Sequence, residues 1–476
     1  MSCTRVAFNL FLCVFLLCIN FFLKGQSVDP LPKKIIRFCV IHSISLSGNK
    51  RTKQKIIFRE LTFHEGDTIA IEELDFRLLR SKQNLLNTSL FNFVTVDTIP
   101  FFNEQIDIHI DVTERWYIFP IPIFEIAERN FNTWWETKDL KRASYGMYLT
   151  DENFRGLKQS LTLKVRLGYG EQYGLSYSIP YINKKQKSGL SFSTSYSRNH
   201  EIPFLTYGNQ LKYYKNIHYY VRQEIAGRIS YSYRSGLYDT HFAELRYIKG
   251  ILADTILNLT PDYFPAGETS TQFFTINYGY KHDYRDSKVY PLKGYYIGVD
   301  VSKVGLGILS GEKINVLQIQ VLARKYIKLY DRVYVGSSIK FKLSSSQKQP
   351  YYVQRALGYG DYVRGYEYYV VDGQSYGLFK SNIHFQIVKP HTKSIPLFEN
   401  DKFDKFHYAF YLGLYFDAAY VKDRFYYANN PITNQWMAGY GASLDFVTYY
   451  DTVVRFEYSR NKLNENIFTI RLGAPL

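Results

Sequence analysis

The sequence predicts an all-β, sixteen-stranded transmembrane β-barrel that follows a small N-terminal α+β domain of βααββ order. Three observations predict this fold. Apolar and polar residues alternate with period two, segment after segment, from Trp116 to the C-terminus. The chain has 45 tyrosines and 35 phenylalanines in 476 residues, and outer-membrane barrels concentrate such side chains at their rims. A helical period is confined to the stretch between Ile35 and Glu114.

Residues 1–26 are typical of a secretory signal peptide. Arg5 supplies a positive charge, Val6–Leu23 is almost wholly apolar, and small and polar residues follow from Lys24. The alternative is an uncleaved transmembrane helix, because the apolar run approaches the length that spans a bilayer. We favour the signal peptide, since no second apolar helix follows. The mature chain then keeps one cysteine, Cys39, which excludes an internal disulfide and a zinc site built from several cysteines.

The formal charge of the chain is strongly positive, at +16. Removing the two cations of the signal peptide, Arg5 and Lys24, leaves +14. A positive net charge of this size indicates binding either to nucleic acid or to an anionic membrane surface. Export favours the membrane, and the sequence shows no helix-turn-helix pattern or zinc-finger spacing. We therefore expect outer-membrane lipids and lipopolysaccharide as partners, and no nucleic acid.

The region 35–114 has the pattern of a compact domain with both helices and strands. A strand is expected over Phe38–Ser47, a helix capped by Thr52 and ending near Glu60, and a second helix from Ile71 to Leu86. Strands are expected over Phe93–Thr98 and Ile106–Glu114, where the isoleucines alternate. Two helices on one face of this sheet make a small α+β domain.

The start of the first helix, "SGNKRTKQKIIFREL", carries a turn signal. Gly48 and Asn49 permit a tight turn, and Thr52 follows as the cap. The order strand, helix, helix, strand, strand resembles a POTRA domain, the periplasmic module attached to outer-membrane assembly and secretion barrels. The resemblance implies that this domain binds client chains, in part by adding a strand at an exposed sheet edge. The chain has room for one copy.

The remainder, 115–476, predicts the barrel. Leu161 to Leu167 alternate with polar residues, and too many such strands occur for a soluble sandwich to bury. An apolar face toward lipid and a polar face toward a wet lumen satisfy both sides, and closure removes free edges. Two turns, near Arg285–Gly294 and Lys389–Lys405, are longer than usual. Sixteen strand centres are expected, near residues 121, 148, 163, 175, 194, 226, 244, 277, 299, 320, 338, 382, 414, 442, 455 and 469.

A glycine- and tyrosine-rich loop between the eleventh and twelfth strands carries the motif "VRGY". The motif consists of Val363, Arg364, Gly365 and Tyr366. It resembles the VRG[FY] signature of the BamA/TamA superfamily of outer-membrane insertases and transporters, and the resemblance extends over nearly the whole mature chain. It implies a loop folded into the lumen, with the arginine paired to an acid on the wall. Gly365 would allow close approach to that wall, and a carboxylate suits a partly dehydrated guanidinium.

Asp417 is the expected partner of the arginine. It lies in "YFDAAY", which is similar to the aspartate segment of the family's thirteenth strand, and strand parity places it toward the lumen. At the family's second acidic position this chain offers Asn382 or His384, and Glu457 is a weaker substitute. Two interpretations stay open, because the arginine either takes part in transport or only pins the plug.

The first barrel strand, "YIFPIPIFEIAE", contains Pro120 and Pro122, which lack an N–H toward the same neighbour. If that neighbour is the last strand, near Ile467, the seam of the barrel is short of hydrogen bonds. In the resembled family this seam is where client strands act. The alternative is a local kink at the domain junction.

Enzyme chemistry is not expected. The sequence lacks GxSxG, HExxH and Walker motifs, so no catalytic residue, metal ligand or cofactor site is assigned. The resemblance implies a monomeric barrel in the bacterial outer membrane, with its N-terminal domain in the periplasm. The expected function is the insertion or transport of client polypeptides through the lateral seam. A passive pore is the alternative, and the sequence leaves open whether helper lipoproteins attach.

Overall fold

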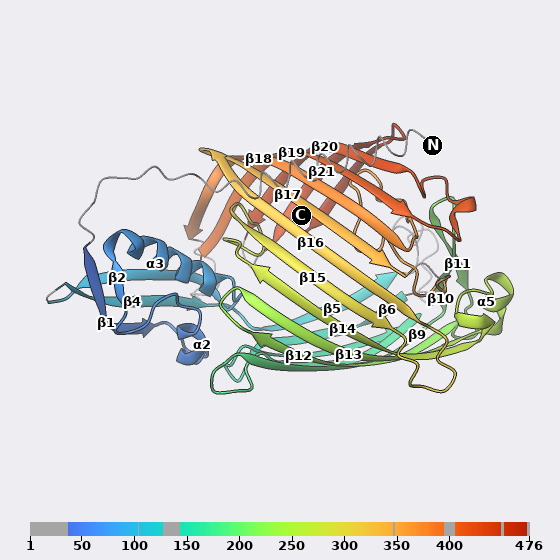
Figure 1. The fold of residues 1–476 in the computed structure, drawn as a ribbon, viewed down its shortest axis with the longest axis horizontal. Helices are drawn as coiled ribbons and strands as arrows, with labels where there is room; N and C mark the ends of the chain where they lie inside the picture. The colour runs from blue at the N-terminus through green and yellow to red at the C-terminus, as the bar shows by residue number, and fades with distance from the viewer. Residues whose placement is uncertain are drawn as a thin grey trace.

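The computed structural model describes residues 37–102, 104–126, 143–345, 348–394, 405–448 and 452–473. The proposed signal peptide, residues 1–26, lies outside these ranges. The chain forms a small domain and a large barrel, and the small domain lies at one end of the barrel (Figure 1). No helix in the described ranges is both long enough and apolar enough to cross a bilayer.

The small domain is a four-stranded sheet with strand order β2-β1-β4-β3, in which β1 and β4 run parallel. Its elements are β1 (Phe38–Ser47), α2 (Gln54–Phe58), β2 (Thr68–Ala70), α3 (Ile71–Leu86), β3 (Phe91–Pro100) and β4 (Gln105–Glu114). Alternate residues of β4, Ile108 and Ile110, point into the core together with Ile41, Phe63 and Leu85. Both expected helices and the three expected strands are present, and the short strand β2 is an addition to the expected order.

The expected cap at Thr52 is wrong. Helix α2 begins after Lys53, whose side chain makes no capping hydrogen bond. Thr52 is buried and faces the barrel, where its hydroxyl accepts a hydrogen bond from the amide of Asn153 at 2.9 Å. Its backbone N–H donates to Glu114 at 2.6 Å. A contact with a residue 101 positions away thus replaces the local cap that the sequence suggested. Just before it, Gly48 adopts a positive φ of 80°, and the Asn49 amide donates to the carbonyl of Thr52 at 3.1 Å.

The barrel wall is a sixteen-stranded sheet in which successive strands pair antiparallel. Its strands are β5 (Ile118–Ile126), β6 (Ala143–Phe154), β7 (Gln159–Gly168), β8 (Gly170–Ile179), β9 (Ser188–Asn199), β12 (Arg222–Arg234), β13 (Asp239–Leu252), β14 (Ser270–Asp283), β15 (Gly294–Val304), β16 (Val316–Tyr330), β17 (Val333–Ser344), β18 (Ser375–Ser394), β19 (Lys405–Lys422), β20 (Trp436–Thr448), β21 (Val453–Asn461) and β22 (Asn466–Leu472). Each expected centre falls inside one of these strands, so the predicted strand count and order are confirmed.

The two faces of the wall differ as the alternation predicts. On β19, Leu412, Leu414 and Phe416 are exposed on the outside, with 45–62% of their surface accessible. At alternate positions of the same strand, Tyr415 and Asp417 point inward and are buried. An apolar band on the outside and polar residues inside are what a lipid-embedded barrel requires.

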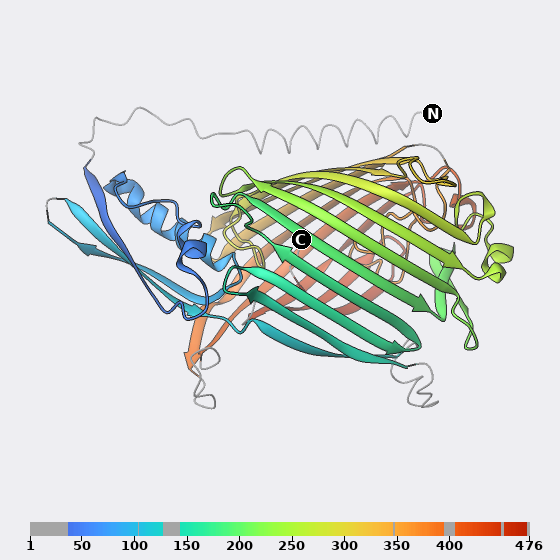
Figure 2. The same ribbon diagram turned by 90° about the horizontal axis from the view of Figure 1, so that it is seen from below.

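The end of the barrel opposite the small domain is covered by loops, as Figures 1 and 2 show. They contain the hairpin β10 (Glu201–Tyr207) and β11 (Gln210–Lys215), helix α5 (Asp254–Leu259) and the 3-10 turns η2 (Pro265–Gly267) and η3 (Tyr427–Asn429). Asn209, at the hairpin tip, joins three loops. Its backbone N–H donates to Asn430, its carbonyl accepts from Val370 N–H, and its amide oxygen accepts from Ile432 N–H, all within 2.9 Å. We call this covering the cap.

Candidate functional site

Arg364 lies inside the barrel, at the tip of the loop between β17 and β18. We call residues 348–374 of this loop the plug. The Arg364 guanidinium donates to both carboxylate oxygens of Asp417, through Nε at 2.8 Å and Nη2 at 2.5 Å, and the Arg364 backbone N–H donates to the same carboxylate at 3.1 Å. The ring of Tyr415 lies 3.9 Å from the guanidinium, and the carbonyl of Ser381 accepts from Nη2 at 3.2 Å. Both charged side chains are buried, so their charges need compensation, which this pair supplies together with Lys380, whose Nζ lies 3.9 Å from Asp417.

Two glycines allow the plug to lie this close to the wall. Gly365 has φ of 91°, and its carbonyl accepts a hydrogen bond from the Asn461 amide on β21 at 2.7 Å. On β20, a Cβ at Gly439 would collide with the carbonyl oxygen of Arg364. The flanking motif residues Val363 and Tyr366 are buried in an apolar cluster with Leu378, Ala419 and Met437.

A network of ionic side chains extends from Arg364 along the inner wall. Glu457 lies at its centre, with Oε1 3.9 Å from Arg364 Nη1 and 3.6 Å from Arg455 Nη1. The other oxygen of Glu457 accepts from Arg471 Nε at 2.8 Å, and Arg471 in turn donates to Glu367 of the plug at 2.8 Å. Glu457, the weaker candidate of the sequence analysis, is therefore the second acid beside Arg364.

The two candidates for the second acidic position lie elsewhere in the lumen. Asn382 is buried on β18, next to Ser381, whose carbonyl contacts Arg364. His384 is also buried, and its Nε2 lies 3.3 Å from Asp445. The structure brings neither side chain to the guanidinium, because the wall carbonyl and Glu457 already surround it.

Three further residues belong to the site but were not expected there from the sequence: Asp445, Arg455 and Tyr290. Asp445 on β20 and Arg455 on β21 are register partners, and Arg455 Nε donates to Asp445 at 2.8 Å. Strand parity and opposite charge would have identified this pair. Nothing in the sequence indicates that Tyr290, in a turn, enters the lumen, where its hydroxyl donates to Asp445 at 2.8 Å.

The seam between β5 and β22 is unpaired over the described residues, because the ordered sheet begins at β22 and ends at β5. Glu152 on β6 donates its N–H to the carbonyl of Tyr117, the residue before β5. Hydrogen-bonded and non-bonded positions alternate along an antiparallel pair, so Phe119 faces β6 whereas Pro120 and Pro122 direct their backbone nitrogens toward β22. The two missing donors therefore belong to the seam. Ile467, on the other side of the seam, is buried on β22.

The small domain is fixed to the barrel by a buried ion pair. Arg234, the last residue of β12, donates to both oxygens of Glu60 at 2.7 Å. Burial alone would raise the pKa of Glu60, but the hydrogen bonds and charge of Arg234 overcome it and lower the pKa to about 2. The described contacts of this domain with the barrel also include Arg51 with Asp151 and Arg80 with Tyr238.

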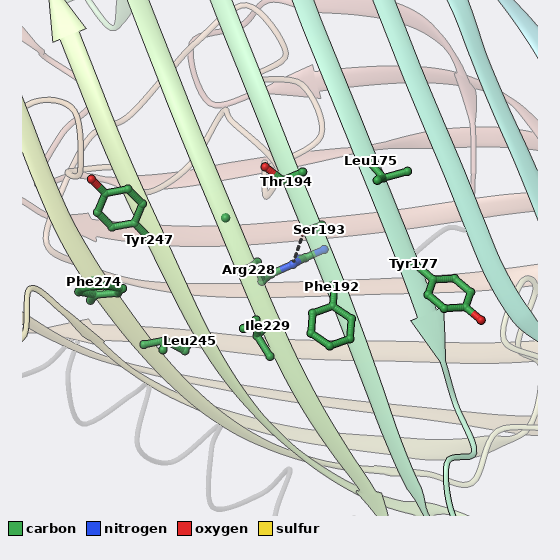
Figure 3. Close-up of a pocket in the computed structure, with 11 residues that line it drawn as sticks. Leu175, Tyr177, Phe192, Ser193, Thr194, Arg228, Ile229, Leu245, Tyr247 and Phe274 are labelled. Carbon is green, nitrogen blue, oxygen red and sulfur yellow. Dashed lines mark hydrogen bonds between the residues drawn. The ribbon is translucent and has the colours of Figure 1, made fainter.

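An apolar hollow of about 410 Å³ lies on the barrel wall over β8, β9, β12 and β13 (Figure 3). Gly227 contributes no side chain at its centre, and Phe192, Ile229 and Leu245 line it. These residues share a face in the register of the sheet, whereas Arg228 donates to Ser193 on the opposite face. The hollow is thus a feature of the apolar outer surface and is separate from the plug.

The fold and the site together define an outer-membrane type of β-barrel whose lumen is occupied by an arginine-bearing loop and whose end carries one small domain. The Omp85 superfamily domain matches residues 153–449, and a POTRA repeat, described as a surface antigen variable number repeat, matches residues 39–115. The chain therefore belongs to the Omp85 superfamily. It is an outer-membrane protein, and its POTRA domain lies in the periplasm. The superfamily acts in the insertion and secretion of proteins at the outer membrane.

Solved structures are similar to this chain at low sequence identity. CdiB from Escherichia coli is 11% identical with a TM-score of 0.52, covering 91% of this chain and 75% of that one. BamA from Haemophilus ducreyi lacking POTRA domains 1–3 is 16% identical over 91% of this chain and 83% of that one, with a TM-score of 0.49. CdiB from Acinetobacter baumannii is 12% identical, with a TM-score of 0.48 and coverage of 92% and 73%. No curated protein matches the chain.

Proposed function

We propose that this chain inserts or transports client polypeptides at the outer membrane through the seam between β5 and β22. The proposal needs no covalent chemistry. In the described ranges, no group of three or more His, Cys, Asp or Glu side chains is arranged to hold a metal ion. The chain would act by offering a backbone edge on which a client strand forms.

The unpaired seam is the observation that carries this proposal. Every other neighbouring pair of barrel strands forms a ladder, whereas β5 and β22 form none over the described residues. Pro120 and Pro122 remove two donors from the β5 side of this boundary. Without these two donors β5 pairs only weakly with β22, so the edge of β22 can be freed to accept an added strand.

The wall is also short at the seam. Over the described residues strand β22 has 7 residues, whereas β16 has 15. A membrane-spanning strand usually needs about 9–11 residues. The outward side chains Phe468, Ile470 and Leu472 remain highly exposed. A short wall with an apolar edge lowers the bilayer thickness that a client must cross.

The POTRA domain offers a second edge for a client. Strand β3 has 10 residues and lies at the edge of its sheet, with β4 as its neighbour. An extended peptide can pair with such an edge before it reaches the barrel. We propose client polypeptides as the partners at both edges, outer-membrane lipids and lipopolysaccharide around the wall, and helper lipoproteins as further partners of the periplasmic end.

A reversible lock on the seam tests the proposal. In a Cys39→Ala background, cysteine pairs placed along β5 and β22 are oxidised to disulfides. A control pair, Ser230→Cys with Glu244→Cys, links register partners on β12 and β13, which are already paired. The chain is placed in liposomes, and an unfolded eight-stranded outer-membrane barrel protein is added as the probe, whose folding is followed by its heat-modifiable gel mobility.

We expect the seam lock to abolish acceleration of probe folding, reductant to restore it, and the control lock to change nothing. Equal folding rates with open and locked seams would refute the proposal. Steady conductance of the locked protein in planar bilayers would then support the alternative, a passive pore.

A further inference from the structure

The turn between β14 and β15, residues 284–293, is held by the end of helix α3 of the POTRA domain. Asn87, the residue that ends the helix, makes hydrogen bonds in both directions with the backbone of the turn. Its amide nitrogen donates to the carbonyl of Asp286 at 3.2 Å, and its amide oxygen accepts from the N–H of Lys288 at 2.9 Å. The Lys288 ammonium also donates to the carbonyl of Asn87 at 3.2 Å. The position of the turn therefore follows the position of the POTRA domain.

A second contact with helix α3 and hydrogen bonds within the turn hold the turn in one conformation. The Arg80 guanidinium lies 3.6 Å from the ring centroid of Tyr284. Within the turn, one oxygen of Asp286 accepts from the backbone N–H of Ser287 at 2.8 Å and of Leu292 at 3.1 Å. A turn braced in this way moves as a body when its support moves.

The same turn reaches the plugged side of the lumen through Tyr290. This side chain is 6% exposed, and its hydroxyl donates to Oδ2 of Asp445 at 2.8 Å. Its ring packs at centroid distances of 5.6 Å on His384 and 4.7 Å on Tyr411. These partners belong to β20, β18 and β19, whereas the turn itself joins β14 to β15. Tyr290 therefore crosses the lumen from one half of the barrel to the other.

From Asp445 the contacts continue to the plug. Its Oδ1 accepts from Arg455 Nε at 2.8 Å, and Arg455 Nη1 lies 3.6 Å from Glu457. The same oxygen of Glu457 lies 3.9 Å from Arg364 Nη1. All of these side chains are buried, where interactions among charges are strong and a change in one partner alters the energy of the next.

We infer that Tyr290 is a positioning residue that couples the seating of the POTRA domain to the hold on the plug, a role whose use rests on the proposed function. A client that draws α3 away from the turn withdraws Tyr290 from Asp445 and loosens the network around Arg364. The coupling is reciprocal, so release of the plug also weakens the seating of the POTRA domain.

Amide hydrogen exchange of the full-length protein in lipid nanodiscs, without client, tests the inference. Exchange is followed separately in the plug, residues 348–374, and in α3. The variants are Tyr290→Phe, which removes only the hydroxyl, Asn87→Ala, which releases the turn from outside the barrel, and their combination. Tyr220→Phe is the matched control, because it also removes a hydroxyl that donates to a carboxylate, that of Glu171, at the capped end.

We expect each single variant to speed exchange in the plug at least about fivefold, the control to leave it unchanged, and the double variant to exceed the larger single effect by little. The shared effect arises because both variants act through one turn. Unchanged plug exchange in Asn87→Ala, or independent effects that multiply in the double variant, would overturn the inference. If Tyr290→Phe fails to fold, plug exchange in Asn87→Ala alone still tests the inference. Because the readout contains no client, failure of the seam lock and failure of this coupling are distinguishable.

Discussion

Inward-facing charged side chains are buried and paired on one part of the barrel wall, whereas on another part an inward arginine is exposed. On the strands β17–β22, which we call the plugged wall, Arg455 and Glu457 are at most 2% exposed, and Glu457 lies 3.9 Å from Arg364 of the plug. On the remaining strands, β5–β16, which we call the open wall, the inward Arg228 is 48% exposed and only loosely paired with Glu244 at 3.8 Å. The difference shows that the Arg364 tip is bound by the plugged wall and that the lumen beside Arg228 is accessible to water.

The POTRA domain contacts the other part of the barrel, the open wall. Its described contacts fall at the ends of the open wall, such as those of Glu60 with Arg234 and Asn87 with the turn 284–293. The Arg364 tip of the plug and the periplasmic domain are thus attached to different parts of the wall, and Tyr290 lies between them. Substitutions matched across the two halves separate what each contributes.

The largest expected effect is at the plugged wall. Arg364→Ala leaves the carboxylate of Asp417 buried without its partner, and removing one member of a buried pair costs about 3–5 kcal/mol. Arg228→Ala removes an exposed pair on the open wall and costs at most about 1 kcal/mol. The free energy of plug opening, measured by hydrogen exchange of residues 348–374, checks both. Similar free energies of plug opening in the two variants would show that the plug is not bound more tightly by one wall than by the other.

The second effect concerns the attachment to the open wall. The pKa of Glu60, lowered to about 2, means that its ion pair stabilises the docked POTRA domain fully above the ordinary pKa near 4.5. This stabilisation is lost as the pH falls from there toward 2. Glu60→Gln should remove on the order of 3 kcal/mol at neutral pH and abolish this pH dependence.

Hydrogen exchange in residues 51–60, measured between pH 7 and pH 3, follows the docking. Glu73→Gln is the control, because Glu73 pairs with Arg77 on the surface of the same domain and is 49% exposed. If docking of the POTRA domain weakens equally in both variants, the buried pair of Glu60 and Arg234 does not stabilise docking more than a surface pair does.

Two glycines give a matched pair across the halves. A Cβ at Gly439 on the plugged wall collides with the carbonyl of Arg364, whereas a Cβ at Gly227 on the open wall meets nothing within 4 Å. Gly439→Ala should destabilise the closed plug by about 1–3 kcal/mol, as overpacking usually does. Gly227→Ala should change it by less than about 0.5 kcal/mol. Plug exchange in the two variants is the measurement, and an effect of Gly227→Ala as large as that of Gly439→Ala would contradict the assigned geometry.

The smallest effect is expected at the seam, where the two walls meet. Pro120→Val and Pro122→Val restore donors toward β22, each worth about 1 kcal/mol when paired. The yield of disulfides between cysteines on β5 and β22 should rise, and probe folding should slow. Phe119→Val, whose N–H faces β6, is the control. Unchanged yields in the proline variants would count against a donor-poor seam.

Most of the barrel could be predicted from the sequence because a strand shows its two faces locally. The alternation in "YLGLYFD" placed Asp417 inside. The turn dipeptide Gly208-Asn209 marks the hairpin of the cap, a local signal from which no hairpin was predicted. Both signals need only neighbouring residues.

The remainder depends on residues distant in sequence. Thr52 looks like a helix cap, and only the nearby Asn153 of the barrel shows otherwise. The direction of the prolines toward β22 follows from a hydrogen bond between Glu152 and Tyr117, which no periodicity reveals. Tyr290 likewise enters the lumen because it belongs to a long turn, and this turn is hydrogen-bonded to the POTRA domain.

Photo-cross-linking of a stalled client tests the central claim most directly. A photoreactive residue is placed at Ile121 on β5, at Ile470 on β22 or, as the control, at Leu245 on the open wall, all three being exposed apolar positions. We expect an unfolded outer-membrane barrel protein arrested during insertion to be captured at Ile121 and Ile470 and not at Leu245. Equal capture at all three positions, or capture at Leu245 alone, would contradict it.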